Sequence, residues 1–167
     1  MMKKRWICLF VENEIGVMAR ISGLFSAKSY NLDSITVGTT EDETISRMTI
    51  SLTSDEKTFE QVKKQLNRSV EVIKVIDYTD ISIHMKELLF VRISHCKEAD
   101  KAEVFRIAQV FNLKVVDYNK NSVLLECLQT EERNNDVIRL MEKCFVNRIE
   151  VVRGGGVAIE GISVSDR

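Results

Sequence analysis

The residues best suited to chemistry in this sequence lie in a polar turn, Glu12-Asn13-Glu14, and directly after it. Gly16, Val17 and Met18 stand where an apolar run gives way to a helical pattern. Peptide N–H groups in the first turn of a helix have no internal acceptor, and the helix dipole favours negative charge there. Glycine also lets a ligand approach the backbone closely. The backbone at these three residues is therefore predicted to hold a carboxylate or a phosphate.

Asn13 adds a side-chain amide that can both donate and accept a hydrogen bond. Such a group suits the ammonium and carboxylate of an amino acid better than a phosphate alone. The alternative interpretation is that Asn13 and Gly16 only form the turn, because both residue types are common in turns. Local sequence leaves both interpretations open.

The elements that position this turn follow from the spacing of apolar residues. In the first half we predict a strand at residues 6–11, a helix with Val17, Ile21, Leu24 and Phe25 on one face, strands at 33–38 and 44–52, a helix with Phe59, Val62 and Leu66 inward, and a strand at 71–78. A capping box from Thr53 to Glu56 is expected to begin the second helix. The predicted order is β-α-β-β-α-β.

The second half repeats this order with little obvious identity. Its predicted elements are strands at 88–94, 113–118, 122–128 and 149–153, a helix at 98–111 with Ala102, Phe105, Ala108 and Phe111 inward, and a helix at 130–145 with Val137, Met141, Cys144 and Phe145 on one face. The fold class is therefore α+β with two ferredoxin-like βαββαβ domains. We expect domains at 1–80 and 86–160, followed by a tail at 161–167.

Several predicted strands are apolar on both faces. In residues 6–11, for example, Ile7, Leu9 and Val11 alternate with Trp6, Cys8 and Phe10. One face should meet the helices of its own half. The other is expected to meet a second subunit or the other half, because an uncovered apolar sheet would promote aggregation.

Composition argues against several classes of protein. The 167 residues include 24 basic and 25 acidic side chains, and the net charge of −1 offers no general attraction to nucleic acid or to an anionic membrane. No segment approaches the roughly 20 apolar residues of a membrane span, and no targeting signal is evident. We expect a cytoplasmic protein. The four cysteines contain no C-x-x-C pair, so they are interpreted as core or half-buried thiols rather than metal ligands.

Catalytic motifs are not evident. His84 and His95 lie outside any nucleophile or metal motif, and Gly154 to Gly156 indicate a flexible exit rather than a nucleotide loop. An RNA-binding module of this topology would carry aromatic residues on its central strands, but residues 46–52 have none. An acylphosphatase-like hydrolase would need an arginine in its first loop, whereas Arg20 lies a turn inside the predicted helix.

The segment from Leu9 to Leu52 closely resembles the opening of the small regulatory subunits of acetolactate synthase (acetohydroxyacid synthase), whose N-terminal half is an ACT domain. The matching motifs are E-N-E-x-G-V, R-I-x-G-L-F, Y-N-L-x-S-I-T-V and S-R-M-T-I. The similarity continues more loosely through residues 86–156 in K-E-L-L-F-V, V-V-D and R-I-E-V-V-R-G-G-G-V-A.

This resemblance implies a subunit with no catalytic residues and no cofactor of its own. Such a subunit binds the thiamine-diphosphate-dependent large catalytic subunit, raises its activity and confers feedback inhibition by valine, its allosteric effector. The family forms a homodimer through the ACT domain. Carried over by position, the valine contacts are Asn13, the backbone at Gly16, Val17 and Met18, and Asn31 with Leu32 from the neighbouring protomer.

The chain departs from the family pattern in three places. Ser29 stands where the family usually has glycine, and a non-glycine residue at a left-handed helix exit costs on the order of 1 kcal/mol. Ile15 replaces a small residue or proline, and Arg153-Gly154-Gly155-Gly156 replaces the usual Arg-Thr-Gly. The alternative hypothesis is a free-standing ACT-domain amino-acid sensor that regulates a different enzyme.

Overall fold

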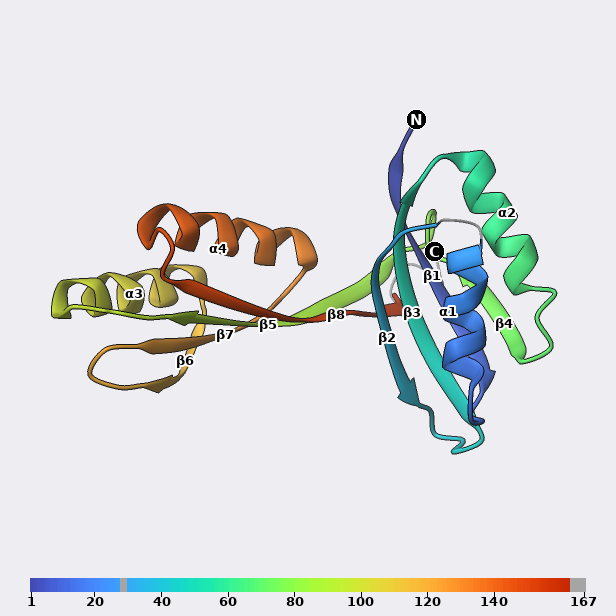
Figure 1. The fold of residues 1–167 in the computed structure, drawn as a ribbon, viewed down its shortest axis with the longest axis horizontal. Coiled ribbons are helices and arrows are strands. Elements are labelled where there is room, and N and C mark those ends of the chain that lie inside the picture. The colour runs from blue at the N-terminus through green and yellow to red at the C-terminus, as the bar shows by residue number, and fades with distance from the viewer. Residues whose placement is uncertain (28–29, 163–167) are drawn as a thin grey trace. The chain divides into compact units, whose positions relative to one another are not determined.

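The computed structural model describes residues 1–27 and 30–162. The chain forms two compact units (Figure 1). Unit 1 comprises Met1–His84 and the segment that begins at Val157, and unit 2 comprises Met85–Gly156. Each unit contains a four-stranded antiparallel sheet with two helices on one face, so the predicted α+β class with two βαββαβ repeats is confirmed. Within the described residues, no helix combines the length and apolar character needed to cross a membrane.

Unit 1 has the predicted order of elements, and several strands are longer than the sequence indicated. Its elements are β1 (Lys3–Glu12), α1 (Val17–Ala27), β2 (Leu32–Thr39), β3 (Ile45–Ser54), α2 (Glu56–Leu66) and β4 (Val72–Asp77). In space the strands are ordered β2-β3-β1-β4. β2 and β4 are therefore the edge strands, and β1 and β3 lie in the centre.

The core of unit 1 lies between this sheet and its two helices. The buried side chains are Ile7, Leu9 and Val11 of β1, Met48, Ile50 and Leu52 of β3, Val17, Ile21 and Phe25 of α1, and Phe59, Val62 and Leu66 of α2. Burial of each such side chain contributes roughly 1.5–3 kcal/mol to folding. The predicted helix faces are confirmed, with Leu24 packed at the edge of the core.

The other side of this sheet, which we call the outer face of unit 1, carries Trp6, Cys8, Phe10, Arg47, Thr49, Ser51, Lys74 and Ile76, as the strand register requires. Cys8, Thr49 and Ser51 are almost fully buried. The end of the last strand, β8 (Ile149–Glu160), contacts this face, where Arg47 Nη2 donates to the Ala158 carbonyl at 3.3 Å. Part of the outer face is thus covered by the C-terminal strand of the same chain.

Unit 2 repeats the topology with β5 (Ile83–Ile93), α3 (Glu98–Phe111), β6 (Lys114–Tyr118), β7 (Val123–Gln129), α4 (Glu131–Cys144) and β8. The strand order is β6-β7-β5-β8. Its core contains Leu89, Val91 and Ile93 of β5 together with Val123, Leu125 and Cys127 of β7, packed against the two helices.

The predicted inner face of α3 is wrong at three of its four positions. Val104, Ile107 and Ala108 are buried, and Lys101 buries its stem while its ammonium pairs with Glu98. The side chains of Ala102, Phe105 and Phe111 are exposed. Phe105 instead packs edge-on against Tyr118, with ring centroids 6.1 Å apart. The helix is therefore rotated so that aliphatic residues, and not the two phenylalanines, face the sheet.

Two smaller predictions are also corrected. The N-cap of α2 is Asp55, which accepts a hydrogen bond from the Thr58 N–H at 3.0 Å, while Thr53 still belongs to β3 and donates to Asp33. The capping box from Thr53 is therefore wrong. Cys144 is exposed at the end of α4, unlike the other three cysteines, which are buried.

The glycines at 154–156 do not form a loop. They lie inside β8, which continues to Glu160 instead of ending at Arg153. Gly155 has a positive φ of 80°, a backbone conformation that favours glycine. The predicted flexible exit is thus a strand that tolerates a local change of backbone direction.

Candidate functional site

The turn between β1 and α1 is the predicted ligand-binding element. Gly16 has a φ of +86°, which L side chains rarely adopt, so glycine is required here by conformation. The Asn13 N–H donates to the Thr44 carbonyl at 2.7 Å, and the Arg20 N–H donates to the Gly16 carbonyl at 3.0 Å. These bonds join the turn to the β2–β3 connection on one side and to α1 on the other.

The side chain of Asn13 also joins the β1–α1 turn to the β2–β3 connection. Its Nδ2 donates to the Glu43 carbonyl at 2.8 Å, and its Oδ1 accepts from the Ser46 hydroxyl at 3.0 Å. An asparagine amide has two N–H donors and two acceptor lone pairs, so one of each remains beyond these bonds. Asn13 is exposed, so solvent or a ligand has access to this residue.

The first turn of α1 contains no acidic residue. The positive end of this helix dipole therefore has no carboxylate of its own in that turn. Of the three amides predicted to hold an anion, that of Val17 already donates to the Glu14 carbonyl at 3.3 Å, and the Val17 side chain is buried. Met18 is 44% exposed. The amides of Gly16 and Met18 are thus the better candidates for a ligand contact.

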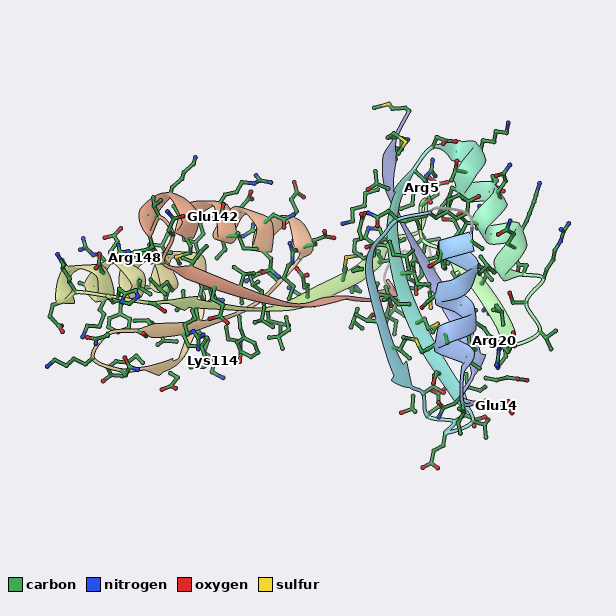
Figure 2. All side chains as sticks on the ribbon, viewed as in Figure 1. Arg5, Glu14, Arg20, Lys114, Glu142 and Arg148 are labelled. Atoms are coloured by element: carbon green, nitrogen blue, oxygen red, sulfur yellow. The ribbon has the colours of Figure 1, made fainter. Side chains whose placement is uncertain are left out.

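Arg20, which was not among the predicted ligand contacts, is a neighbour of this turn. A side chain added at Gly16 would meet Arg20 Nη1 at 3.2 Å, so the guanidinium lies beside the turn. Its Nε forms an ion pair with Glu71. Arg20 is labelled in Figure 2, together with Glu14 of the turn. The signal in the sequence is its spacing, because a residue four positions after Gly16 lies one helical turn further along the same face.

Asn31 and Leu32 lie at the other end of the sheet from this turn. Leu32 pairs with Leu52 near the end of β3, whereas Ser46, the partner of Asn13, lies at its beginning. Strand geometry places these two points roughly 20 Å apart. One chain therefore brings Asn13, Gly16, Val17 and Met18 together but does not bring Asn31 and Leu32 to them.

Other features of the predicted pocket can also be placed. Asn31 is exposed, and Leu32 is half-buried against the core of unit 1. Ile15 is fully exposed at the tip of the turn. Ser29, where the sequence departs from the family glycine, lies outside the described residues.

The titratable side chains of the described residues show no clustered metal site, since no group of three His, Cys, Asp or Glu converges. His84 and His95 are both exposed, as expected of surface or strand-end residues. Burial raises the pKa of Cys127 to about 11, so this thiol stays protonated at neutral pH.

Comparison with known proteins gives two family matches, one in each half of the chain. Residues 7–74 match the model of the AHAS small subunit-like ACT domain, and residues 86–162 match that of the small subunit of acetolactate synthase. A probable acetolactate synthase small subunit from Archaeoglobus fulgidus is 38% identical over 93% of this chain and 96% of its own length. This chain belongs to the acetolactate synthase small-subunit family.

Further relatives extend this assignment. The acetolactate synthase small subunit of Aquifex aeolicus is 36% identical over 94% of this chain and 81% of its own. The crystal structure of the small subunit from Thermotoga maritima superposes with a TM-score of 0.83 at 28% identity, covering 95% of this chain and 98% of that one. The match to the small-subunit ACT domain includes the whole β1–α1 turn, so the candidate site lies in the ACT domain.

Proposed function

We propose that this chain is the regulatory subunit of an acetolactate synthase in branched-chain amino-acid biosynthesis and acts in the cytoplasm. It binds the thiamine-diphosphate-dependent large subunit, raises its activity and makes it sensitive to valine. Membership of the small-subunit family supports the first part. The observation that carries the second is the β1–α1 turn, where Gly16 holds a positive φ before a helix with no acidic residue in its first turn.

In the proposed complex, the carboxylate of valine lies at the amides of Gly16 and Met18. This position is favoured by the dipole of α1 and by the nearby guanidinium of Arg20. The ammonium of valine faces Asn13 Oδ1, which keeps one lone pair beyond its bond from Ser46.

A second copy of the chain completes this site. β2 is an edge strand, and in a two-fold antiparallel pair the beginning of one β2 lies beside the end of the other. The end of β2, at Thr39, pairs with Ser46, which bonds Asn13. The partner's Asn31 and the partner's Leu32 therefore arrive at the β1–α1 turn, and six side-chain and backbone contacts converge at the dimer interface.

The proposed division of labour follows the two repeats. Residues 1–80 form the domain that binds the effector, and residues 86–160, followed by the tail 161–167, form the domain that holds the large subunit. The outer face of the unit 2 sheet supports the second role, because it exposes Leu88, Leu128 and Val152 and carries the half-buried Phe90 and Leu124 around Arg92 and Glu150. A contiguous apolar face of this kind is typical of a subunit interface.

Effector binding then shifts an equilibrium between active and inhibited arrangements of the holoenzyme. Couplings of about 1–3 kcal/mol are usual for such regulation and change affinity several-fold to a hundredfold. The exact size depends on how differently valine binds the two arrangements.

Reconstitution of the chain with an acetolactate synthase large subunit tests the proposal. The expected result is a gain in the rate of acetolactate formation, which added valine reverses. Calorimetric titration of the isolated chain with valine, leucine and isoleucine gives the preferred effector. Binding of an amino acid without any gain in large-subunit activity would instead identify a free-standing sensor.

A further inference from the structure

A second pocket opens on the outer face of unit 1, on the side of the sheet opposite α1 and α2. Its volume is about 670 Å³, and its walls include Phe10, Arg47, Lys74, Ile76, Ile159 and Glu160. Small-molecule sites usually measure roughly 300–1,000 Å³. This pocket is separate from the β1–α1 turn, since none of its lining residues belongs to the segment 13–18.

Arg47 is held rigidly at the wall of this pocket. Its Nε donates to Cys8 Sγ at 3.2 Å, and its Nη2 donates to the Tyr78 hydroxyl at 2.7 Å and to the Ala158 carbonyl. Its guanidinium carbon lies 5.2 Å from the centroid of the Phe10 ring. Among the described residues no acceptor is bound to Nη1, so two N–H donors of a fixed guanidinium remain for a carboxylate.

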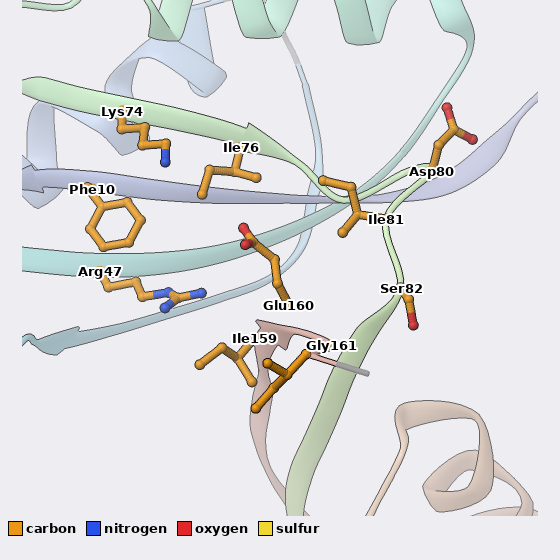
Figure 3. A pocket seen from close by; sticks show the side chains of 11 residues that line it. Phe10, Arg47, Lys74, Ile76, Asp80, Ile81, Ser82, Ile159, Glu160 and Gly161 are labelled. Atoms are coloured by element: carbon orange, nitrogen blue, oxygen red, sulfur yellow. The ribbon is translucent and has the colours of Figure 1, made fainter. Parts of the chain in front are cut away.

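Four charged side chains, those of Arg47, Lys74, Asp80 and Glu160, line the same space without pairing with one another. Figure 3 shows Arg47, Lys74 and Glu160 directed toward the pocket, with Phe10 and Ile76 along its wall. Within the part of the chain that the structure describes, none of these four charges forms an ion pair. Cations and a carboxylate that face one cavity but do not neutralise each other suit a ligand that carries both signs of charge.

Apart from Ser82 and Gly161, the uncharged part of the wall is apolar. Phe10 and Ile76 come from the sheet, while Ile81 and Ile159 come from the segments that cross its outer face. Such a surface favours a branched or aromatic side chain and disfavours a purely polar zwitterion such as glycine.

We propose that this pocket is a second amino-acid site, which binds an apolar α-amino acid with its carboxylate toward Arg47 and Lys74 and its ammonium toward Glu160. The side chain of the ligand lies against Phe10 and Ile76. This inference goes beyond the proposed valine site, because it needs neither the β1–α1 turn nor a second copy of the chain. The competing explanation is that Arg47 serves only to fasten the end of β8 to the sheet.

The test uses the full chain and L-leucine as the probe, followed by backbone amide signals in nuclear magnetic resonance spectra. We expect saturable shifts at Ile76, Ile159 and Gly161. Two analogues, 4-methylpentanoate without the ammonium and 3-methylbutylamine without the carboxylate, should each bind at least about tenfold more weakly, because each leaves one charge without a partner.

Two variants locate the binding. Glu160→Gln keeps the shape of the side chain but removes its charge, and it should weaken leucine binding at these signals about tenfold. Glu142→Gln, which removes an exposed charge on α4, is the matched control and should leave binding unchanged. Gly16→Asp, aimed at the valine site, should also leave the Ile76 and Ile159 shifts intact.

The outcomes separate the two sites. If leucine shifts only residues 13–18, or if both analogues bind as well as leucine, the second site is wrong while the proposed valine site stands. If leucine saturates the shifts at Ile76 and Ile159 while neither leucine nor valine ever shifts residues 13–18, the second site stands and the valine site is wrong. If Ile76, Ile159 and Gly161 show no saturable shift, the second site is wrong, and Arg47 serves only to hold the end of β8 to the sheet.

Discussion

In unit 1 the turn before α1 leaves the helix end available to a ligand, whereas in unit 2 the turn before α3 is already occupied. There Asp100 accepts from the Lys97 N–H at 2.8 Å and from Arg148 Nη1 at 2.9 Å, and Arg148 also donates to the His95 carbonyl. The hydrogen bond from Arg148 lowers the pKa of Asp100. The same topology thus leaves a helix start without a carboxylate in its first turn in unit 1, where we propose the anion site, and fills it with Asp100 in unit 2.

The outer faces of the two sheets differ in a similar way. That of unit 1 buries Cys8, Thr49 and Ser51 and meets the end of β8. That of unit 2 leaves Leu128 57% and Val152 56% exposed. This difference agrees with the proposal that one copy of the repeated fold binds a small ligand and the other a larger partner.

The largest expected effect comes from Gly16→Asp. The new carboxylate would lie beside that of valine, and a non-glycine residue at this φ costs about 1 kcal/mol in addition. We expect valine affinity to fall by about a hundredfold or more, measured by calorimetry and by inhibition of the holoenzyme. Gly23→Asp is the matched control, since a side chain at Gly23 meets nothing within 4 Å. Full inhibition of the Gly16→Asp holoenzyme by valine would contradict the pocket assignment.

The next effect concerns the outer face of unit 2. Leu88→Glu places a charge in the proposed subunit interface, because Leu88 lies opposite Leu128 on this face. We expect binding to the large subunit to weaken at least about tenfold, measured by surface plasmon resonance. Val110→Glu, at a position on α3 that is 77% exposed, should bind normally. Equal binding by both variants would move the interface elsewhere.

A smaller effect is expected at the filled helix end of unit 2. Asp100→Asn removes the anion that caps α3 and pairs with Arg148, and it should lower the midpoint of thermal unfolding. Asp136→Asn, which breaks only an exposed i,i+3 pair with Arg139, should leave the midpoint unchanged. Calorimetric scans of both variants check this, and valine affinity should be unaltered in each.

The smallest effect is the response of unit 1 to acid. Burial alone would raise the pKa of Asp77, but hydrogen bonds from Lys63 Nζ and Thr79 outweigh it, and the pKa is lowered. The stabilisation is complete above the unfolded value of about 3.9 and is lost as pH falls through the lower folded pKa. We expect a contribution of at most about 1 kcal/mol. Denaturant titrations at pH 7 and pH 3 should show a smaller loss for Asp77→Asn than for the parent chain.

The fold was predictable because its signals are local. The alternation of apolar and polar residues at 46–52 predicts a strand, and the helical spacing of Val17, Ile21 and Phe25 predicts a helix. The face of α3 was not predictable in this way, because Phe105 and Phe111 keep the same helical period as the aliphatic residues that are buried. To choose between two such helix faces, one must know which side chains of the sheet the helix packs against.

The candidate site was predictable in part for the same reason. Asn13 and Gly16 are only three residues apart, so a single turn is enough to bring them close in space. The position of Arg20 followed from spacing but carried no motif, and the distance between Leu32 and this turn depends on strand register. Arg47 joins Tyr78 and Ala158, which are 31 and 111 residues away along the chain, and no local pattern reports such a contact.

β3 has a further consequence for how the ACT domain can respond. Ser46, which bonds Asn13, and Arg47, which bonds the Ala158 carbonyl, are consecutive residues with side chains on opposite surfaces of the strand. Because successive residues of a strand project to opposite faces, a displacement of β3 at this point would move both contacts. We therefore expect a change at the β1–α1 loop to be transmitted through β3 to the C-terminal strand on the opposite side of the sheet.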